Sequence, residues 1–492
     1  MDAMGLLGRL RGVLFYAGIP LLIPAIYGYY MGEGIWRVLA LTALIMMLPE
    51  VPQLIAGGFR SMAGLFHGIS RWIFRRGEKA WGAGVMLEGV GRKLDELTLG
   101  EALALTSLAW IVIPAIGAIP YAYAGLGPMD AFFESMSGWT STGLSVVDAP
   151  ENFPQSLLLF RSITQWIGGL GIIILMLAVL RGREARTLLK AEGRESLGTS
   201  ISKTVRTYWK IYIVLSVLGL GLLYAVGLDP FNSVNLMMSG ISNGGFFPFS
   251  HYDFTDAQKF ALAGLMFAGA TSFVFFDRVS RGQIFTAVKD EELILYVLLT
   301  LVAVALIALI GHEELYNSIL NSVSAIACGG FAIGDVAVMH EFSKYMIIIL
   351  MICGGMYGST TGAVKLWRIL VVGKSVSHRI RQAFLPAGAV QAVKVNGVAV
   401  GIETVIESAV FIFAYMALLL FGAGVFIAAG DGMVDSLFIA ASSMGNVGLS
   451  TFAISAIPAA HKAFLILLMY LGRIEIFPSL ALARYVVGLV KR

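Results

Sequence analysis

The chain has 492 residues, of which 58% are hydrophobic and only 13% are charged, with a formal net charge of +4. The charged share is about half that of a typical soluble domain, so the composition excludes an ordinary soluble protein and predicts one embedded in lipid. The only two cysteines, Cys328 and Cys353, lie in apolar surroundings, which argues against a disulfide framework. The basic residues fall in short segments between apolar blocks, so no nucleic-acid partner is expected.

Two apolar blocks open the chain, and we expect membrane helices at 12–31 and 35–57. The first block follows Arg9 and Arg11, as the apolar part of a secretory signal peptide would. It is long, however, and the second block follows almost at once without an obvious small-residue cleavage site. We therefore interpret residues 1–98 as two transmembrane helices and a cytosolic linker.

Eight further apolar blocks follow in four pairs, each block being close to the roughly 20 helical residues that cross a bilayer. The expected spans are 103–125 with 155–180, 206–227 with 257–276, 292–311 with 343–371, and 400–428 with 460–488. With the first two helices this makes an even number, so both termini are expected on the same side of the membrane.

The same pattern lies between the two spans of every pair: a helix-like stretch, a glycine-centred turn and a polar return. Small residues are common in membrane helices because they help packing, but four matched copies with matched flanks favour an internal repeat. The turns are Ser141-Thr142-Gly143-Leu144, Asn243-Gly244-Gly245-Phe246, Cys328-Gly329-Gly330-Phe331 and Asn446-Val447-Gly448-Leu449. We predict an all-α polytopic membrane protein with four tandem helix/pore-loop/helix repeats around a central pore, plus two N-terminal transmembrane helices. The repeats are expected at 99–181, 205–279, 291–372 and 399–492.

Charge predicts which side faces the cytosol. Lysine and arginine are frequent in 58–100, 181–205, 277–291 and 372–399, so the positive-inside rule places these connections and both termini in the cytosol of a cell-membrane protein. The glycine turns then open outward, among acidic residues that would attract a cation. Acidic residues also occur in ordinary extracellular loops, so this second signal is less specific. The outward acidic residues are Asp130, Glu134, Asp148, Glu151, Asp229, Asp253, Asp256, Glu313, Glu314, Asp335, Glu341, Asp431 and Asp435, against Lys259, Lys344 and Lys462.

Irregular backbone at membrane depth is tolerated only where it is buried in protein or lines a watery cavity. Four such turns are therefore expected to share one axis, where their carbonyl oxygens could replace the hydration shell of a cation. Glycine suits this place because it adopts backbone angles that other residues avoid. We predict that a cation binds to carbonyls of Ser141, Thr142, Gly143, Asn243, Gly244, Gly245, Cys328, Gly329, Gly330, Asn446, Val447 and Gly448, and the resemblance described next implies that this cation is K⁺.

At these turns the chain resembles the Trk/Ktr/HKT superfamily of potassium transporters, and within it the larger Trk-type pore-forming subunits with two extra N-terminal helices. The resemblance implies one filter glycine per repeat, at Gly143, Gly245, Gly330 and Gly448, and four glycines are typical of the potassium-permeable members. The chain departs from the commonest pattern at Gly244 and Cys328. The most specific motifs are Met136-Ser137-Gly138-Trp139-Thr140-Ser141-Thr142-Gly143, Gln165-Trp166-Ile167-Gly168-Gly169-Leu170-Gly171, Gly358-Ser359-Thr360-Thr361-Gly362 with Lys365, and Leu471-Gly472-Arg473-Ile474-Glu475-Ile476-Phe477.

Two features inside the spans suggest a barrier to the ion. Glycines in the middle of the span at 343–371 predict a broken helix, and the resemblance implies a gating loop there, with Gly354, Gly355, Gly358 and Gly362 as its glycines. Arg473 lies near the middle of the last expected span, and an ionisable group in a span is a functional candidate by default. The alternative is a structural ion pair of Arg473, for example with Glu475, although residues two apart on a helix do not face each other.

Other classes of protein fit the sequence less well. No Ser, His and Asp set with a catalytic spacing is found, so no enzyme is predicted. A sodium-permeable or ion-coupled secondary cation transporter is the alternative, because broken helices and repeats also mark that class, although its repeats are usually two. The resemblance implies a homodimer in membrane lipid and a separately encoded, TrkA/KtrA-like nucleotide-binding regulatory subunit on the cytosolic face. No cofactor is expected in the chain, with potassium as the permeant ion.

Overall fold

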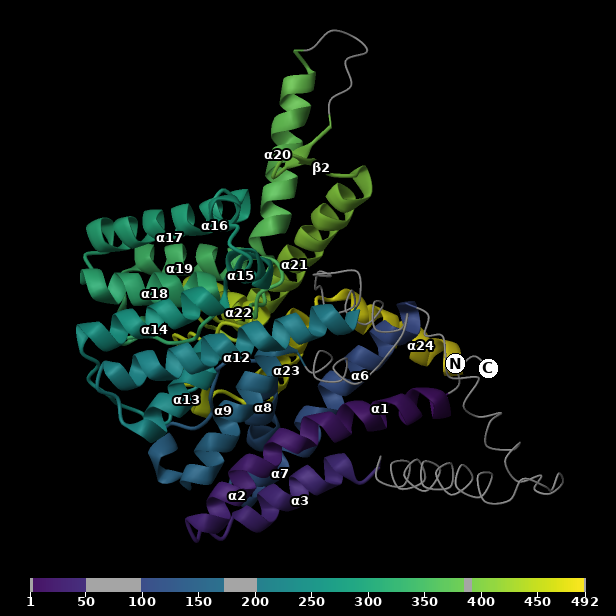
Figure 1. Cartoon of the computed structure of the whole chain (residues 1–492), viewed down its shortest axis with the longest axis vertical. Coiled ribbons are helices and arrows are strands. Elements are labelled where there is room, and N and C mark those ends of the chain that lie inside the picture. Colours follow the sequence, from purple (N-terminus) through teal and green to yellow (C-terminus); the bar gives the residue numbers. More distant parts are fainter. Residues whose placement is uncertain (1–2, 50–98, 172–200, 385–391, 491–492) are drawn as a thin grey trace, which may run out of the picture.

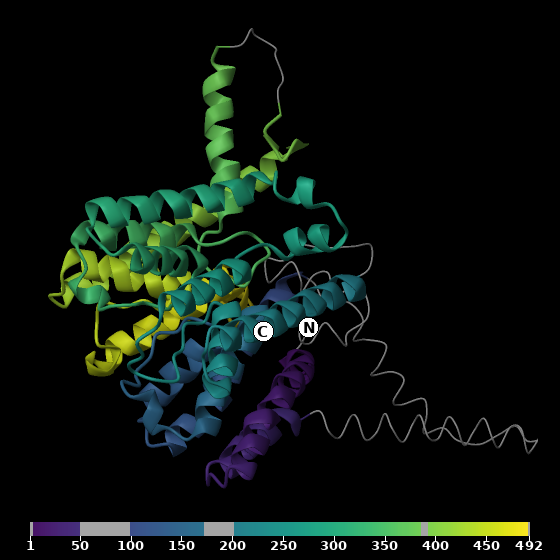
Figure 2. The same cartoon turned by 60° about the vertical axis from the view of Figure 1, so that its left-hand side comes forward.

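A computed structural model describes residues 3–49, 99–171, 201–384 and 392–490 of the chain. These residues are mostly helical, and the strands found among them form one short antiparallel hairpin, β1 (Lys394–Val395) and β2 (Val398–Ala399). Figure 1 shows the helices packed into one body, from which α20 (Leu366–Gln382) and the hairpin project. The view in Figure 2 shows the same projection. The all-α fold class is confirmed.

The N-terminal helices pack against the first repeat. They are α1 (Ala3–Gly18), η1 (Ile19–Leu21), α2 (Leu22–Tyr30) and α3 (Trp36–Met47). The turn between α2 and α3 places Glu33 at the start of α9 (Gln155–Leu170), where its carboxylate accepts the backbone N–H groups of Gln155 at 2.9 Å and Ser156 at 3.0 Å. A carboxylate at a helix N-terminus satisfies free donors and complements the helix dipole, so Glu33 fixes this region on the repeat.

The rest of the described chain contains four units of the same order: a long helix, a shorter helix that ends in a loop, and a returning helix, which is broken in the second, third and fourth units. Residues 172–200, which follow α9, lie outside the described residues. The last helix, α24, packs against α6, so the fourth unit returns to the first. The first unit is α6 (Leu99–Gly117), α7 (Ile119–Tyr123), α8 (Pro128–Trp139), η2 (Pro150–Asn152) and α9; the second is α12 (Ile201–Ala225), α13 (Pro230–Ile241), α14 (Asp256–Gly269) and α15 (Phe273–Ser280), followed by α16 (Ile284–Ala287); the third is α17 (Glu291–Ile310), α18 (Leu315–Ala327), η3 (Val336–Val338), α19 (Glu341–Cys353) and α20; the fourth is α21 (Ile402–Ala428), α22 (Met433–Gly445), η4 (Ile454–Ala456), α23 (Ala459–Arg473) and α24 (Phe477–Val490).

Five helices among the described residues are long and apolar enough to cross a membrane, and up to seven spans result if each of two bent helix pairs is one span. The five are Arg9–Tyr30, Gly100–Tyr123, Thr204–Ala225, Glu291–Ile310 and Ile402–Ala428. The expected spans at 35–57 and 155–180 begin as α3 and α9 and then leave the described residues. The repeat boundaries stay predictions.

The expected spans at 257–276 and 460–488 are bent in the structure. The chain turns by 93° between α14 and α15 and by 107° between α23 and α24. At the second bend Glu475 and Ile476 have positive φ angles of 61° and 64°, and Pro478, near the start of α24, has no N–H to continue the helix before it. The expected break inside 343–371 is confirmed, since α19 ends at Cys353 and α20 begins at Leu366.

Candidate functional site: a ring of four glycine loops

The short helices α8, α13, α18 and α22 end in the same way. One or two residues after each helix end, the backbone adopts a left-handed conformation. The φ angle is 53° at Ser141, 54° at Asn243, 56° at Cys328 and 53° at Asn446. The next N–H reaches back to a serine carbonyl five residues earlier, and these hydrogen bonds are Thr142 to Ser137 at 2.9 Å, Gly244 to Ser239 at 2.8 Å, Gly329 to Ser324 at 2.7 Å and Val447 to Ser442 at 2.8 Å. This is the Schellman termination, and here it turns four chains out of their helices with one geometry.

The glycine that follows each of these turns also has a positive φ, 90° at Gly143, 80° at Gly245, 71° at Gly330 and 98° at Gly448. A Cβ atom built on Gly143 would lie 2.2 Å from the carbonyl oxygen of Gly244, and one on Gly245 would lie 2.7 Å from the Cα atom of Gly330. One on Gly330 would lie 2.5 Å from the Val447 oxygen, and one on Gly448 would lie 2.2 Å from the Thr142 oxygen. The four loops therefore close a ring.

We call the loops 141–143, 243–245, 328–330 and 446–448 the glycine ring. All twelve residues predicted from the sequence for ion binding lie in it, so the structure brings them together. Four helices end at the ring with their C-termini, and each of those ends carries a partial negative charge. No cluster of three or more His, Cys, Asp or Glu side chains that could hold a metal occurs in the described part of the chain. The ring therefore offers backbone oxygens, which suit a hard cation.

The loop between α19 and α20, residues 354–365, lies directly against the ring. The Asn243 and Thr360 side chains are hydrogen-bonded at 2.9 Å, and a Cβ atom on Gly362 would lie 2.6 Å from the oxygen of Gly445. The loop also fills the break between α14 and α15: Met356 N–H donates to the Ala270 oxygen at 3.0 Å. Two of the glycines predicted for gating, Gly354 and Gly358, have positive φ angles of 68° and 75° in this loop.

Arg473 stands at the end of α23 and reaches two other repeats. Its guanidinium donates to the carbonyl oxygen of Thr360 at 3.0 Å and to that of Gly169 at 3.0 Å, and it also contacts the Gly168 oxygen. The last two oxygens belong to the C-terminal end of α9, where the helix dipole favours a cation. Arg473 thus connects the fourth repeat, the first repeat and the 354–365 loop.

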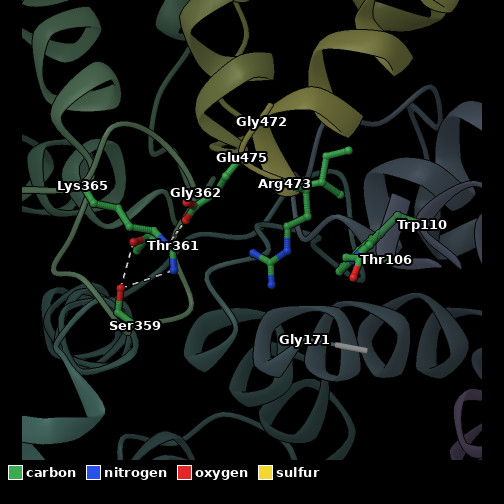
Figure 3. Close-up of a pocket in the computed structure, with 11 residues that line it drawn as sticks. Thr106, Trp110, Gly171, Ser359, Thr361, Gly362, Lys365, Gly472, Arg473 and Glu475 are labelled. Carbon is green, nitrogen blue, oxygen red and sulfur yellow. Dashed lines mark hydrogen bonds and ion pairs between the residues drawn. The ribbon is translucent and has the colours of Figure 1, made fainter. Parts of the chain in front are cut away.

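Glu475 does not serve as the partner that the structural alternative suggested for Arg473. Its carboxylate accepts from Lys365 at 2.7 Å and from Arg368, both on the third repeat. Arg473, Lys365 and Glu475 line a cavity of about 30 Å³, room for a water molecule or two, with Trp110 and Gly362. Figure 3 shows the Arg473 side chain pointing into this space, between Trp110 and Thr106 on one side and the loop on the other.

Several of the acidic residues expected at the outer mouth are paired. Lys462 contacts Asp130 at 2.7 Å, and Lys344 contacts Asp435 at 3.2 Å, each pair joining two repeats. Glu134 lies near the turns as expected, but it is fully buried and pairs with Arg161 at 2.7 Å, so it adds no open negative charge. Farther out, the Ser250 hydroxyl donates to Glu151 at 2.5 Å and holds the pKa of that carboxyl below its usual value.

Two buried side chains near the ring, Arg161 and Gln165, were not predicted as site residues. They lie one turn apart on α9 and both contact the second repeat. The signal that could have identified them is their polarity inside an apolar span, because such residues face the interior of a membrane protein.

Four loops that meet in one ring, on broken helices of a polytopic helical fold, define a membrane protein of the ion-transport class. The TrkH family, described as cation transport proteins, matches residues 92–284 and 282–487. An uncharacterised cation transporter from Methanocaldococcus jannaschii is 32% identical and covers 98% of this chain and 95% of its own length. The Trk system potassium uptake protein TrkH of Escherichia coli K12 is 28% identical over 88% of this chain and 94% of its own.

A solved structure has the same fold. The crystal structure of the potassium transporter TrkH from Vibrio parahaemolyticus aligns with a TM-score of 0.77 at 24% identity, covering 98% of both chains. The chain belongs to the TrkH family of cation transport proteins, and the resemblance seen in its sequence motifs is confirmed.

Proposed function

We propose that this protein takes up potassium ions across the cell membrane through a channel-like pore whose selectivity filter is the glycine ring. The observation that carries the proposal is the closed set of approaches from Gly143 to Gly244, Gly245 to Gly330, Gly330 to Val447 and Gly448 to Thr142. A ring of backbone carbonyls can replace the water around a cation of suitable size. The potassium uptake proteins among its relatives favour K⁺ as that cation.

In this proposal the 354–365 loop and Arg473 form the gate below the ring. The loop contains no helix or strand and is held by hydrogen bonds to other segments, such as Met356 to Ala270 and Thr360 to Gly269 at 3.3 Å. Such a segment can move without unfolding the helices that flank it. The guanidinium of Arg473 would repel a cation that leaves the ring toward the cytosol.

Regulation is proposed to come from a separate nucleotide-binding subunit on the cytosolic face, and the transporter is proposed to be a homodimer with both termini in the cytosol. The basic end of α20, with Arg379 and Arg381 in its last turn, offers charge to such a partner. Because α20 projects from the helical body (Figure 1) and begins where the 354–365 loop ends, a partner bound to it could act on the gate.

The alternative is a sodium-permeable or ion-coupled secondary cation transporter, and the bends at α14–α15 and α23–α24 also suit that class. Purified protein in liposomes, given imposed K⁺ and Na⁺ gradients with the flux of each ion recorded, separates the two. We expect K⁺ to move down its own gradient without a proton or Na⁺ gradient. If K⁺ flux requires a proton or Na⁺ gradient, the protein is an ion-coupled carrier and the proposal of a channel-like pore is wrong.

A further inference from the structure

The eleventh residue of the returning helix differs in one repeat of the four. It is Gln165 in α9, whereas α14, α19 and α23 carry Met266, Met351 and Met469 there. In the second repeat this position packs against the next loop of the ring, since a Cβ atom on Gly329 would lie 2.1 Å from the Met266 sulfur. A thioether has no hydrogen to donate, so only the first repeat presents a donor at this position.

Gln165 directs its whole amide at the loop of the second repeat. Its Nε2 atom donates to the carbonyl oxygen of Gly244 at 2.5 Å, and its Oε1 atom accepts from the Ser239 hydroxyl at 2.6 Å and from the Phe246 N–H at 3.2 Å. The side chain is fully buried. The Gly244 oxygen is the one that faces Gly143 in the ring, so this oxygen is shared between the ring and the amide.

Arg161, one turn earlier on α9, contacts the residues that follow Gly244 and Gly245. It donates to the Phe247 oxygen at 3.0 Å, and its guanidinium carbon lies 4.1 Å from the centre of the Phe246 ring. The Glu134 carboxylate that holds Arg161 also accepts the Val146 N–H at 3.1 Å. Residues 244–247 are therefore fixed at two points by α9.

The contacts between repeats on the outer side of the ring show how the junction of the first and second repeats differs from the other three. At the fourth residue of the returning helix, three repeats carry a lysine that reaches the third residue of the next short helix: Lys259 to Asn317 at 3.3 Å, Lys344 to Asp435 at 3.2 Å and Lys462 to Asp130 at 2.7 Å. In α9 this position is Leu158. The first and second repeats lack this lysine contact; they are joined by Gln165 at the level of the ring, by Ser162 and Asn235 at 2.7 Å, and farther out by Glu151 and Ser250.

We propose that Gln165 is a positioning residue that holds the Gly244 carbonyl oxygen in place and so sets the preference of the ring for a larger over a smaller cation. This inference rests on the proposed potassium-selective pore. An oxygen held by a buried amide cannot move inward to meet a smaller ion, and one of its lone pairs is already engaged. The other three positions carry methionine, so of these four side chains Gln165 is the one that holds a ring oxygen through its amide.

The test is Gln165→Met, which places in α9 the residue that the other three helices carry. Flux of K⁺ and Na⁺ is measured separately in liposomes, and thermal unfolding in detergent checks the fold. We expect the K⁺ over Na⁺ flux ratio to fall about threefold to tenfold, as the loss of one hydrogen bond converts to a ratio. Ser239→Ala removes only the hydroxyl that orients the amide, and we expect a smaller fall in the same direction.

Gln258→Met is the matched control. Gln258 is also buried, and its amide donates to a backbone carbonyl, that of Val226 at 3.2 Å, away from the ring. It should lower the unfolding temperature and leave the flux ratio unchanged. A folded Gln165→Met or Ser239→Ala protein with the wild-type ratio overturns the positioning role. Wild-type protein that passes K⁺ and Na⁺ equally, or neither, overturns the proposed function itself, which makes the two failures distinguishable.

Discussion

Arg473 and Thr360, which come from the fourth and third repeats, meet in a hydrogen bond of 3.0 Å from the guanidinium to the backbone oxygen. This contact joins the only arginine of α23 to the loop that lies against the glycine ring. Two unit charges about 4 Å apart repel by about 4 kcal/mol at an effective dielectric constant near 20, and water in the cavity reduces that value.

We expect Arg473→Ala to raise basal K⁺ flux about tenfold, because about 1.4 kcal/mol of lost repulsion corresponds to a factor of ten in rate. Liposome flux without any added partner measures it. Arg473→Lys keeps the charge and serves as the control, with flux near that of the wild type. Folded Arg473→Ala protein with unchanged or lower flux would show that the residue is structural and that the barrier lies elsewhere.

Shortening the 354–362 stretch should also raise basal K⁺ flux, because it removes part of the loop that lies against Asn243 and Gly445. A milder form of the same change is Gly362→Ala, whose Cβ atom would lie 2.6 Å from the Gly445 oxygen and would push the loop away from the ring. Gly373→Ala, on α20 with open space around it, is the matched control. Equal flux in the shortened protein and the wild type would rule out the loop as a plug.

Gly143→Ser should admit relatively more Na⁺. The residue has φ of 90°, and a Cβ atom there would lie 2.2 Å from the Gly244 oxygen, so the ring must change its carbonyl spacing to hold a side chain. Strain of about 1 to 2 kcal/mol from the left-handed backbone comes in addition. Gly125→Ser is the control, because Gly125 has a φ of 102° in a turn with open space. If the relative Na⁺ and K⁺ fluxes stay as in the wild type, Gly143 does not belong to the filter.

Removing one partner of the buried Glu134 and Arg161 pair is expected to destabilise the fold more than removing both partners. Arg161→Met alone leaves a buried carboxylate without its partner and should lower the free energy of unfolding by about 3 to 5 kcal/mol. The double variant Glu134→Leu with Arg161→Met should be less destabilised than Arg161→Met, because no buried charge remains. Unfolding in detergent compares the double variant with both single variants, Arg161→Met and Glu134→Leu. A double variant that loses the sum of both single effects would mean that the side chains act independently.

A soluble partner is expected on the cytosolic face. Pull-down from native membranes with the full chain should recover it, and adding nucleotide should change K⁺ flux through the native assembly. Replacing Arg379 and Arg381 at the end of α20 by Gln should weaken the capture, since both are in its last turn. Membranes that give no partner, together with flux that no nucleotide alters, would remove the regulatory proposal.

The four loops could be predicted from the sequence because their chemistry is local. A left-handed residue, a glycine two positions later and a small residue at the helix end are all within a few positions, as around Ser141 and Gly143. The bend after α14 could not be predicted from the sequence, because the apolar residues continue through it. The freed oxygen of Ala270 accepts from Met356, a residue of another repeat.

The contact partners of the buried polar residues could not be predicted from the sequence either. Glu475 was considered beside Arg473 because the two are neighbours in the chain, whereas it pairs with Lys365 and Arg368 across a helix junction. Gln165 belongs to a sequence motif that predicts no role for this side chain. Its meaning depends on Gly244 and Ser239 in the next repeat, and only the folded chain brings them together.

The ring closes from Gly448 back to Gly143 within one polypeptide. In an assembly of four identical subunits, one codon change would alter all four loops of the ring at once. Most such changes would abolish conduction through the pore. Here a codon change alters one side. Each side can therefore diverge separately during evolution, and the difference between Gln165 and the three methionines is the kind of inherited asymmetry that such a gene can accumulate and a symmetric one cannot.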